Sequence, residues 1–259
     1  MSTVDAPLVH DLPTEILDRI FSSADIWQLA TLRQVCSHWR CIVDKPSRWK
    51  RVLLRERSQP RQKRISSPPS AFTSNLWTLD SLRYLLNPNL HHIQSLTISG
   101  VRDSTVRFIL LQCPLLENLE IMSWNTLSNH ALTLIHHLNL RCFKIIGIVD
   151  QFLAIDALSL AHFILFCPSL HKLSINHCRI CVHPDIFLKQ LRSRLGDSCL
   201  YTMTSIILSS LQQPWSRHHV DQLLALCPSL YHLRLESKSS TIIMTKQLDS
   251  QYITVTAMN

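Results

Sequence analysis

The sequence comprises 259 residues, of which 46% are hydrophobic and 17% charged, so it can bury a core and general disorder is excluded. Its formal net charge of +8 is confined to residues 45–64, where nine basic side chains accompany one acidic one, while the remaining residues carry 17 of each sign. This distribution does not predict a general phosphate-binding surface, so nucleic acid is not the expected partner.

Nine cysteines, an odd number, favour buried free thiols in a reducing compartment over a disulfide framework. The N-terminus shows no basic-then-apolar leader, and no run of about 18 apolar residues predicts a membrane helix. We therefore expect a cytoplasmic or nuclear location, or both, and no membrane partner.

Three helices are predicted within residues 12–49, after a short tail over residues 1–11. The first follows Pro13, since proline is tolerated in a first helical turn. Its apolar side chains recur at helical spacing and form a stripe wider than a lone surface helix needs. They are Ile16, Leu17, Ile20 and Phe21.

Asp25 is expected to cap a second helix. A third should end before Pro46, because the residue ahead of a proline avoids the helical conformation. The apolar positions of these two helices are Ile26, Leu29, Ala30 and Leu32, then Val35, Trp39, Ile42 and Val43. Residues 47–54 are predicted to form a fourth helix that ties Trp49 to the unit. A unit of about 40 residues lies at the lower limit of independent stability, so it is expected to need the rest of the chain or a partner.

In order and spacing, the residues of this unit resemble the F-box family. The matching positions are Leu12-Pro13, Glu15-Ile16-Leu17, Ile20-Phe21, Leu29, Leu32, Val35-Cys36, Trp39-Arg40 and Trp49. The resemblance implies a helical domain over residues 8–54 that docks on the Skp adaptor and, through it, on a cullin–RING ubiquitin ligase. It further implies that most of the adaptor contact is made by Leu12, Pro13, Ile16, Ile20, Leu29, Val35 and Trp39.

Residues 55–75 combine charge, serine and proline with almost nothing to bury, so they are predicted to be a linker. The basic cluster from Arg61 to Arg64 fits a nuclear-import patch, a contact for acidic partners or a solvated connector. The connector is the favoured interpretation, because charge runs usually have that role.

From residue 76 to residue 259 the sequence is predicted to form one repetitive domain. Three segments share the pattern Cys-Pro-x-Leu-x-x-Leu-x-(Ile/Leu), starting at Cys113, Cys167 and Cys227, and each follows an amphipathic helical run. Related strands give leading apolar positions at 93, 116, 140, 170, 203 and 230, spaced by 23, 24, 30, 33 and 27 residues. Stacked strand–helix units of this kind bury a continuous core that one unit cannot form.

This period, with an L-x-x-L-x-L strand and a helix in each unit, resembles the leucine-rich repeat family. The two resemblances imply an α/β fold: a three-helix F-box unit, then a short, irregular leucine-rich-repeat solenoid of alternating helix and parallel strand. The longer intervals are expected to bulge out as loops. A last edge strand at 241–244 or 252–255 is left open.

Alternation along the strands turns a second set of side chains away from the core. We expect an unidentified protein target to contact these outward positions, whose mixed charge predicts a partner of mixed polarity. They are Asn118, Glu120, Met122, Lys144, Lys172, Ser174, Asn176, His232, Arg234 and Glu236.

The tightest group of metal-binding side-chain types is His177, Cys178, Cys181 and His183. No second Cys-x-x-Cys exists, and the adjacent His177 and Cys178 can hardly both reach one tetrahedral ion. Cys178 is therefore interpreted as a structural residue of the turn after a repeat strand. Three histidine doublets, at 91–92, 136–137 and 218–219, are interpreted as polar surface. No metal and no cofactor is expected.

No catalytic motif occurs, and the three glycines form no phosphate loop, so no catalytic residue and no enzyme activity is predicted. A catalytic cysteine stays open, because its histidine partner would be adjacent only in space. The favoured function is the substrate-recognition subunit of a Skp–cullin–F-box (SCF) ubiquitin ligase, holding its target on the solenoid. The alternatives are an interaction scaffold without a ligase role and, least favoured, a nucleic-acid or chromatin factor acting through residues 45–64.

Overall fold

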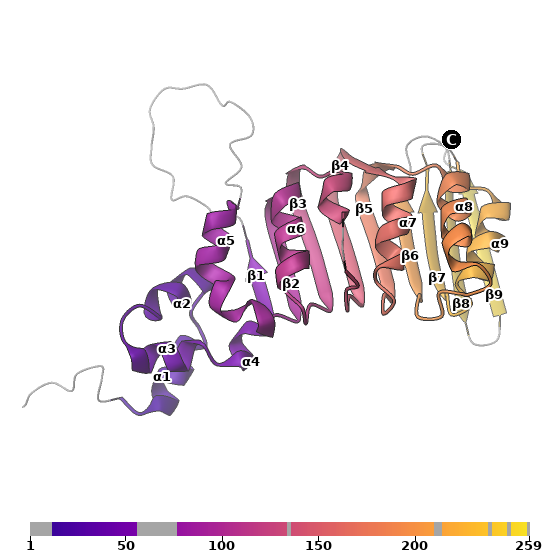
Figure 1. Ribbon diagram of the computed structural model, residues 1–259. Helices are drawn as coiled ribbons and strands as arrows, with labels where there is room; N and C mark the ends of the chain where they lie inside the picture. The colour runs from indigo at the N-terminus through magenta and orange to yellow at the C-terminus, as the bar shows by residue number, and fades with distance from the viewer. Residues whose placement is uncertain are drawn as a thin grey trace, which may run out of the picture.

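The structure, a computed structural model, describes residues 12–55, 77–133, 136–209, 214–237, 240–247 and 250–257. Within these residues the protein is a mixed α/β molecule, with a helical unit at one end and a nine-stranded sheet whose strands lie side by side in chain order (Figure 1). The predicted tail, the basic cluster at Arg61–Arg64 and nearly all of the predicted linker lie outside the described residues. In the part of the chain that is described, no helix is long and apolar enough to span a bilayer.

The N-terminal unit contains α1 (Thr14–Phe21), α2 (Ile26–Leu32), α3 (Ser37–Val43) and the single turn α4 (Pro46–Trp49). The predicted cap is confirmed: Asp25 accepts a hydrogen bond from the Gln28 amide, and the Gln28 side chain accepts one from the Asp25 amide. The helices pack on one another through the buried side chains Leu17, Phe21, Leu29, Ala30, Ile42, Val43 and Trp49.

The prediction of a helix over residues 47–54 is correct for its first residues, which belong to α4, and wrong for residues 51–54. After α4 the chain extends into β1 (Arg51–Leu54), which pairs in parallel with β2 (Ser95–Arg102), so these residues belong to the sheet. Val52 and Leu54 are buried beneath the helices, whereas Arg51 and Leu53 are exposed. Because a run of Trp49, Val52, Leu53 and Leu54 fits both a helical and an alternating pattern, sequence spacing alone did not separate the two.

The sheet continues through parallel strands and ends in an antiparallel hairpin. The parallel strands after β2 are β3 (Asn118–Thr126), β4 (Cys142–Asp156), β5 (Lys172–Cys181), β6 (Ser205–Ser209) and β7 (His232–Glu236). The hairpin is β8 (Ser240–Gln247) with β9 (Ser250–Ala257), so both segments that the sequence left open are strands. Strand β8 runs antiparallel to β7, and β9 runs antiparallel to β8.

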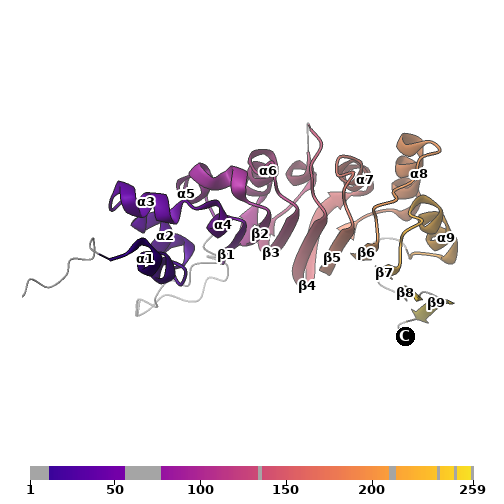
Figure 2. The same ribbon diagram turned by 90° about the horizontal axis from the view of Figure 1, so that it is seen from below.

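Helices connect the strands and cover one face of the sheet, and none of the helices in the described residues lies on the other face (Figure 2). They are α5 (Leu79–Leu86), η2 (Asn87–His92), α6 (Asp103–Gln112), η3 (Asn129–Leu132), α7 (Ala157–Leu165), α8 (Pro184–Leu195) and α9 (Arg217–Leu226). We expected the longer intervals between repeats to bulge out as loops, and this prediction is wrong. The 12-residue α8 and the 15-residue β4 take up most of the extra residues. A mostly parallel sheet with one helical layer fits a repeat-like α/β fold.

A regular backbone pattern joins the helical unit to every later unit. The carbonyl oxygen just before each of the strands β1–β6 accepts hydrogen bonds from the amides of the two residues at the start of the next strand unit, at 2.7–3.2 Å. These carbonyls belong to Lys50, Gln94, Glu117, Arg141, His171 and Thr204. The residue before each is an apolar side chain at most 3% exposed: Trp49, Ile93, Leu116, Leu140, Leu170 and Met203. Trp49 therefore occupies the same position in the first unit as the predicted leading residues do in the others.

Polar contacts also fix the helical unit against the first units of the sheet. Asp44 accepts hydrogen bonds from Arg33 on one side and from Asn89 of η2, at 3.1 Å, on the other. On the opposite side, the rings of Trp27 and Trp77 stack at 5.4 Å between centroids and 12° between planes. The unit is thus held from two sides, which sets the orientation of α1 and α2 relative to the sheet.

Candidate protein-binding surfaces

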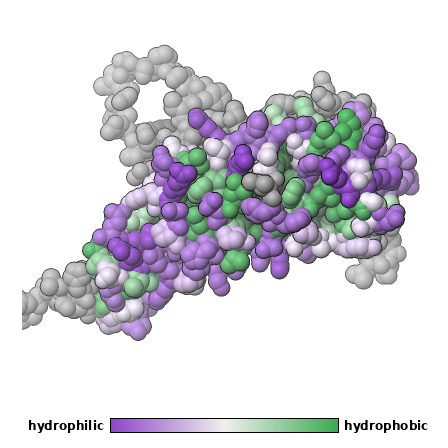
Figure 3. Space-filling model, viewed as in Figure 1, coloured by the Kyte–Doolittle hydropathy of each residue, from purple (hydrophilic) through white to green (hydrophobic). Residues whose placement is uncertain are grey.

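Helix α1 buries one side and exposes apolar residues on the other. Leu17 and Phe21 lie in the core, whereas Ile16 is 45% exposed and Ile20 is 51% exposed. Residues i and i+4 share a helix face, so these two side chains form one apolar surface. Figure 3 shows hydrophobic residues among polar ones on the surface of the helical unit. An exposed pair of isoleucines on a small unit is the arrangement expected where another protein covers it.

The seven predicted adaptor contacts differ in their accessibility. Pro13 is exposed, Leu12 is half-buried, and Val35, between α2 and α3, is 51% exposed. Leu29 is only 9% exposed, so it packs inside the helical unit. Trp39 is half-buried and packs edge-on against Phe21, at 5.1 Å between ring centroids. Leu12, Pro13, Ile16, Ile20 and Val35 are the ones that a partner can reach most directly.

An ionic cluster holds α1 in this orientation. The Asp18 carboxylate accepts hydrogen bonds from Lys45 Nζ at 2.9 Å and from Arg48 Nη2 at 2.7 Å, and Arg48 also donates to the Asp18 carbonyl. Hydrogen bonds from Lys45 and then Arg48 hold the pKa of Asp18 below its ordinary value. Asp18 therefore anchors α1 to the segment around α4. These contacts do not involve the exposed side chains Ile16 and Ile20.

The ten predicted target contacts lie on strands, in the outward phase of the alternation. Parallel pairing aligns Glu120, Lys144 and Ser174 across β3–β5, with Ile207 and Arg234 continuing the row. A second row joins Asn118, Lys172 and His232 through Cys142 and Ser205, and a third contains Met122 and Asn176. Glu236 lies at the end of β7, opposite Ser209.

Some of these charges are already paired with one another. Lys144 Nζ lies 2.9 Å from Glu120 Oε1, and Glu236 accepts hydrogen bonds from Arg234 Nε and Ser209 Oγ, both at 2.6 Å. Lys172 is exposed and forms no ion pair with another described residue, and Asn118 is an exposed uncharged amide. The surface therefore offers both fixed ion pairs and unpaired polar groups, in three aligned rows.

The cysteine and histidine positions differ partly from expectation. Strand β5 runs through Cys178, so this residue is in a strand and not in the turn predicted for it, and burial raises the pKa of its thiol to about 12. Among the described side chains, which do not include His177, no three His, Cys, Asp or Glu residues are grouped as metal ligands.

One residue of the histidine doublets was misassigned. His219 was interpreted as polar surface, but it is buried, with Nε2 3.0 Å from Asp185 Oδ1 and Nδ1 accepting the amide hydrogen of Ser216. It therefore serves as part of the capping box of α9 and connects that helix to α8.

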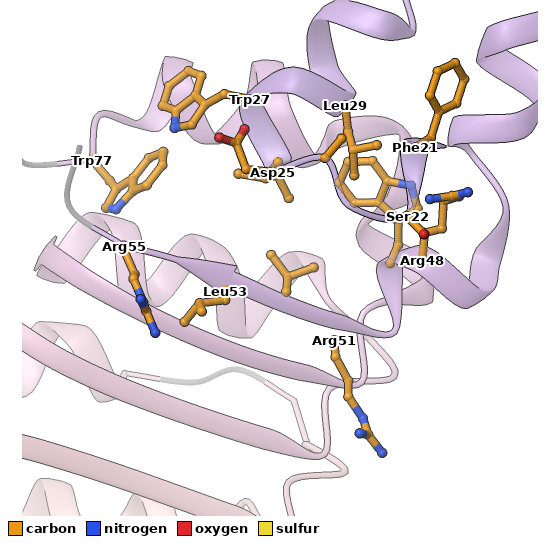
Figure 4. Close-up of a pocket in the computed structure, with 14 residues that line it drawn as sticks. Phe21, Ser22, Asp25, Trp27, Leu29, Arg48, Arg51, Leu53, Arg55 and Trp77 are labelled. Carbon is orange, nitrogen blue, oxygen red and sulfur yellow. The ribbon is translucent and has the colours of Figure 1, made fainter. Parts of the chain in front are cut away.

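A cleft between α2 and β1 was not predicted. It has a volume of about 650 Å³ and lies along the edge of β1 that faces away from β2 (Figure 4). Trp27, Trp77 and Asp25 line one side, Arg51 and Leu53 come from β1, and Arg55 is the residue directly after it. The available signal was the spacing Trp49-x-x-Val52-x-Leu54, which repeats that of the later strands and would have placed β1 at the sheet edge.

The sequence of residues 9–55 matches the protein-family model described as F-box-like. The described part of that stretch comprises α1–α4 and β1, so the helical unit is an F-box-like domain, which supports an F-box protein as the class. F-box domains generally bind the Skp adaptor within cullin–RING ubiquitin ligases. No curated protein shows significant similarity to the chain.

Proposed function

We propose that this chain is the substrate-recognition subunit of an SCF ubiquitin ligase. The F-box-like helices dock on the Skp adaptor, and the sheet holds a target protein near the ubiquitin-carrying enzyme. The chain itself makes and breaks no bond. It raises the rate of ubiquitin transfer to the target by tethering. Tethering replaces a bimolecular encounter with a local one at an effective concentration of about millimolar.

The observation that carries the proposal is the exposed apolar face of α1 within an F-box-like domain. Ile16 and Ile20 are turned away from a core that Leu17 and Phe21 complete without them. Apolar groups fully removed from water at an interface contribute about 1.5–3 kcal/mol each, which gives this face a substantial share of a binding energy.

The domain that follows the helices supplies the target surface in this proposal. Its stacked strand–helix units, with equivalent apolar residues at the predicted leading positions, support a leucine-rich-repeat-like solenoid over residues 76–259. Strand β1 adds a first unit to it. The three outward rows, which include Glu120, Lys144 and Arg234, are the surface on which we place the target.

Copurification with the Skp adaptor tests the proposal. We expect the full chain to bring down both adaptor and cullin, and we expect Ile16→Asp/Ile20→Asp and Leu12→Ala/Pro13→Ala to lose both. Leu158→Asp/Ile186→Asp is the matched control, because these isoleucine-sized residues on α7 and α8 are equally exposed and lie outside the F-box-like domain.

Three outcomes would contradict the proposal or the observation that carries it. If the unmodified chain binds no adaptor, the docking role is lost. If adaptor is bound without cullin, the chain is an interaction scaffold and not a ligase subunit. Unchanged binding by Ile16→Asp/Ile20→Asp would remove the face of α1 from the interface.

A further inference from the structure

We propose that the free edge of β1 binds an extended peptide of a partner protein, with acidic residues on either side of an apolar one, which adds to the sheet in the cleft beside α2. This proposal deepens the proposed function. It rests on that function in one respect, because we take the peptide to be a segment of the target protein. Peptide binding is measured without adaptor or cullin, so the two proposals fail separately.

The backbone of β1 is the first element of this site. Among the described strands β1 pairs with β2 alone, so it is an edge strand. The Lys50 carbonyl accepts the Ser95 amide, and in a parallel pair alternate residues bond to the neighbour. Val52 and Leu54 therefore direct their backbone groups to β2, while the amide and carbonyl of Leu53 point into the cleft. An unpaired edge of this kind is a template for an added strand.

The side chains around that edge define the chemistry of the peptide. Arg51 and Leu53 share one face of β1, Leu53 is 48% exposed, and the exposed Arg55 follows the strand at the same two-residue spacing. Cross-strand neighbours face each other on a sheet, so an added strand would oppose an apolar residue to Leu53 and acidic residues to the two arginines. The pattern acidic-x-apolar-x-acidic reads the same in both directions and does not depend on strand polarity.

The opposite wall of the cleft consists mainly of two aromatic rings. Trp27 and Trp77 stack there at 5.4 Å between ring centroids, and the indole N–H of Trp77 is itself buried, so this wall contributes apolar ring surface. In Figure 4 these two rings lie across the cleft from β1. A volume of about 650 Å³ is in the range of pockets that enclose small ligands, and it is sufficient for a few residues of extended chain.

Charge complementarity selects a foreign acidic peptide over the other occupants. A second copy of β1 would place arginines opposite arginines, which is destabilising for directly opposed pairs. The chain that follows β1 is also basic, with Arg57, Arg61, Lys63 and Arg64 against Glu56 in residues 56–64. Asp25 is the one acidic residue among those that line the cleft, and Arg48 is already held by Asp18.

Fluorescence anisotropy of labelled peptides on the full chain tests the site. The probe has Glu-Thr-Ile-Thr-Glu between neutral flanks, and its matched control has Thr-Glu-Ile-Glu-Thr between the same flanks. The control has the same composition and charge, but its acidic residues lie on the face opposite to the isoleucine. We expect the probe to bind at least tenfold more tightly than the control.

Variants separate the backbone contribution from that of charge. Leu53→Pro removes the outward amide while leaving the β2 ladder, since proline is tolerated at a strand edge whose N–H faces outward. It should weaken probe binding about tenfold more than Leu53→Ala does. Arg51→Glu/Arg55→Glu should abolish binding of the probe and restore it for Lys-Thr-Ile-Thr-Lys, which keeps the test valid if the proline variant fails to fold.

Three results would overturn the proposal. Equal affinity for probe and control would show that only net charge is recognised. Absence of binding below about 1 mM would exclude the site as a peptide receptor. Self-association that Leu53→Pro abolishes, without peptide binding, would assign the edge of β1 to a second copy of the chain.

Discussion

Single residues in this chain show how burial controls ionisation. Cys113 and Cys227 cap the C-termini of α6 and α9, and Cys167 directly follows the cap of α7. Their carbonyls accept the Leu116, Leu230 and Leu170 amides in the tight turns that lead into β3, β7 and β5, respectively. Burial raises the pKa of each of these thiols from 9.0 to about 12. Their position, repeated in the sequence, is structural.

The raised pKa values predict a loss of stability at high pH. Between pH 9 and 12 the folded state keeps these thiols protonated while the unfolded state ionises them, so unfolding becomes easier as pH rises. Each thiol lowers the free energy of unfolding by about 1.4 kcal/mol per pH unit in that range. When the free energy of unfolding is measured in urea at several pH values between 9 and 10.5, it should fall less steeply with pH in Cys167→Ala than in the unmodified protein. The exposed Cys41 supplies the control, since Cys41→Ala should leave the pH dependence of the unfolding free energy unchanged. The same pH dependence in both variants would contradict the account.

Asp44 is the second residue whose removal has a defined consequence. Its carboxylate accepts from Arg33 and Asn89 and joins the helical unit to η2, so Asp44→Ala leaves a half-buried guanidinium without its partner. We expect the free energy of unfolding to fall by about 1–3 kcal/mol. Asp80→Ala, which removes only an exposed pair with Arg83, should cost less than about 0.5 kcal/mol. Equal thermal denaturation midpoints for the two variants would show that the Asp44 contacts do not stabilise the fold.

At the scale of elements, the sequence predicted the helices best where capping and periodicity agreed. Asp25 with Gln28 marks the start of α2, and Pro46 marks the end of α3. The six leading apolar positions were also predicted correctly, because Ile93, Leu116 and their equivalents precede strands with clear alternation. Their burial is required by the stacking of units, which makes them recognisable without a structure.

The elements that were missed have local patterns that do not distinguish between alternatives. Strand β1 is only four residues long and follows a helical turn, so its identity depends on β2, which is over 40 residues away. Helix α8 lies in an interval that was expected to be loop, and β8 and β9 are fixed by pairing with β7 and with each other. The cleft depends on two tryptophans from segments 50 residues apart, which no local pattern brings together.

Trp49 tests whether the helical unit and the sheet are one cooperative structure. It is 1% exposed, donates from Nε1 to the Val43 carbonyl at 2.9 Å, and occupies the first leading position of the sheet. Trp49→Ala should cost about 3–5 kcal/mol and destabilise both parts together. Leu53→Ala, in the same segment but exposed, should cost less than about 1 kcal/mol. Hydrogen exchange that increases only in α1–α3, with β2 and β3 unchanged, would show that the two parts unfold separately.

At the scale of the whole molecule, one end and one face are available to partners. The F-box-like domain presents Ile16 and Ile20 at the end, while the sheet presents its outward rows on the face opposite the helices (Figure 2). Because the ladder of carbonyls from Lys50 to Thr204 is continuous, a protein held at the end and one held on the sheet would keep a fixed relative position. That rigidity is what the proposed tethering function requires.

Isothermal titration calorimetry of the full chain with purified Skp adaptor, repeated at several temperatures, tests the central claim most directly. Docking through an exposed apolar face predicts a one-to-one complex with a negative heat-capacity change, because apolar surface is removed from water. Ile16→Asp/Ile20→Asp should abolish the heat of binding while circular dichroism shows the fold intact. A chain that is folded but gives no binding heat at any temperature, and forms no complex in sedimentation, would contradict the account.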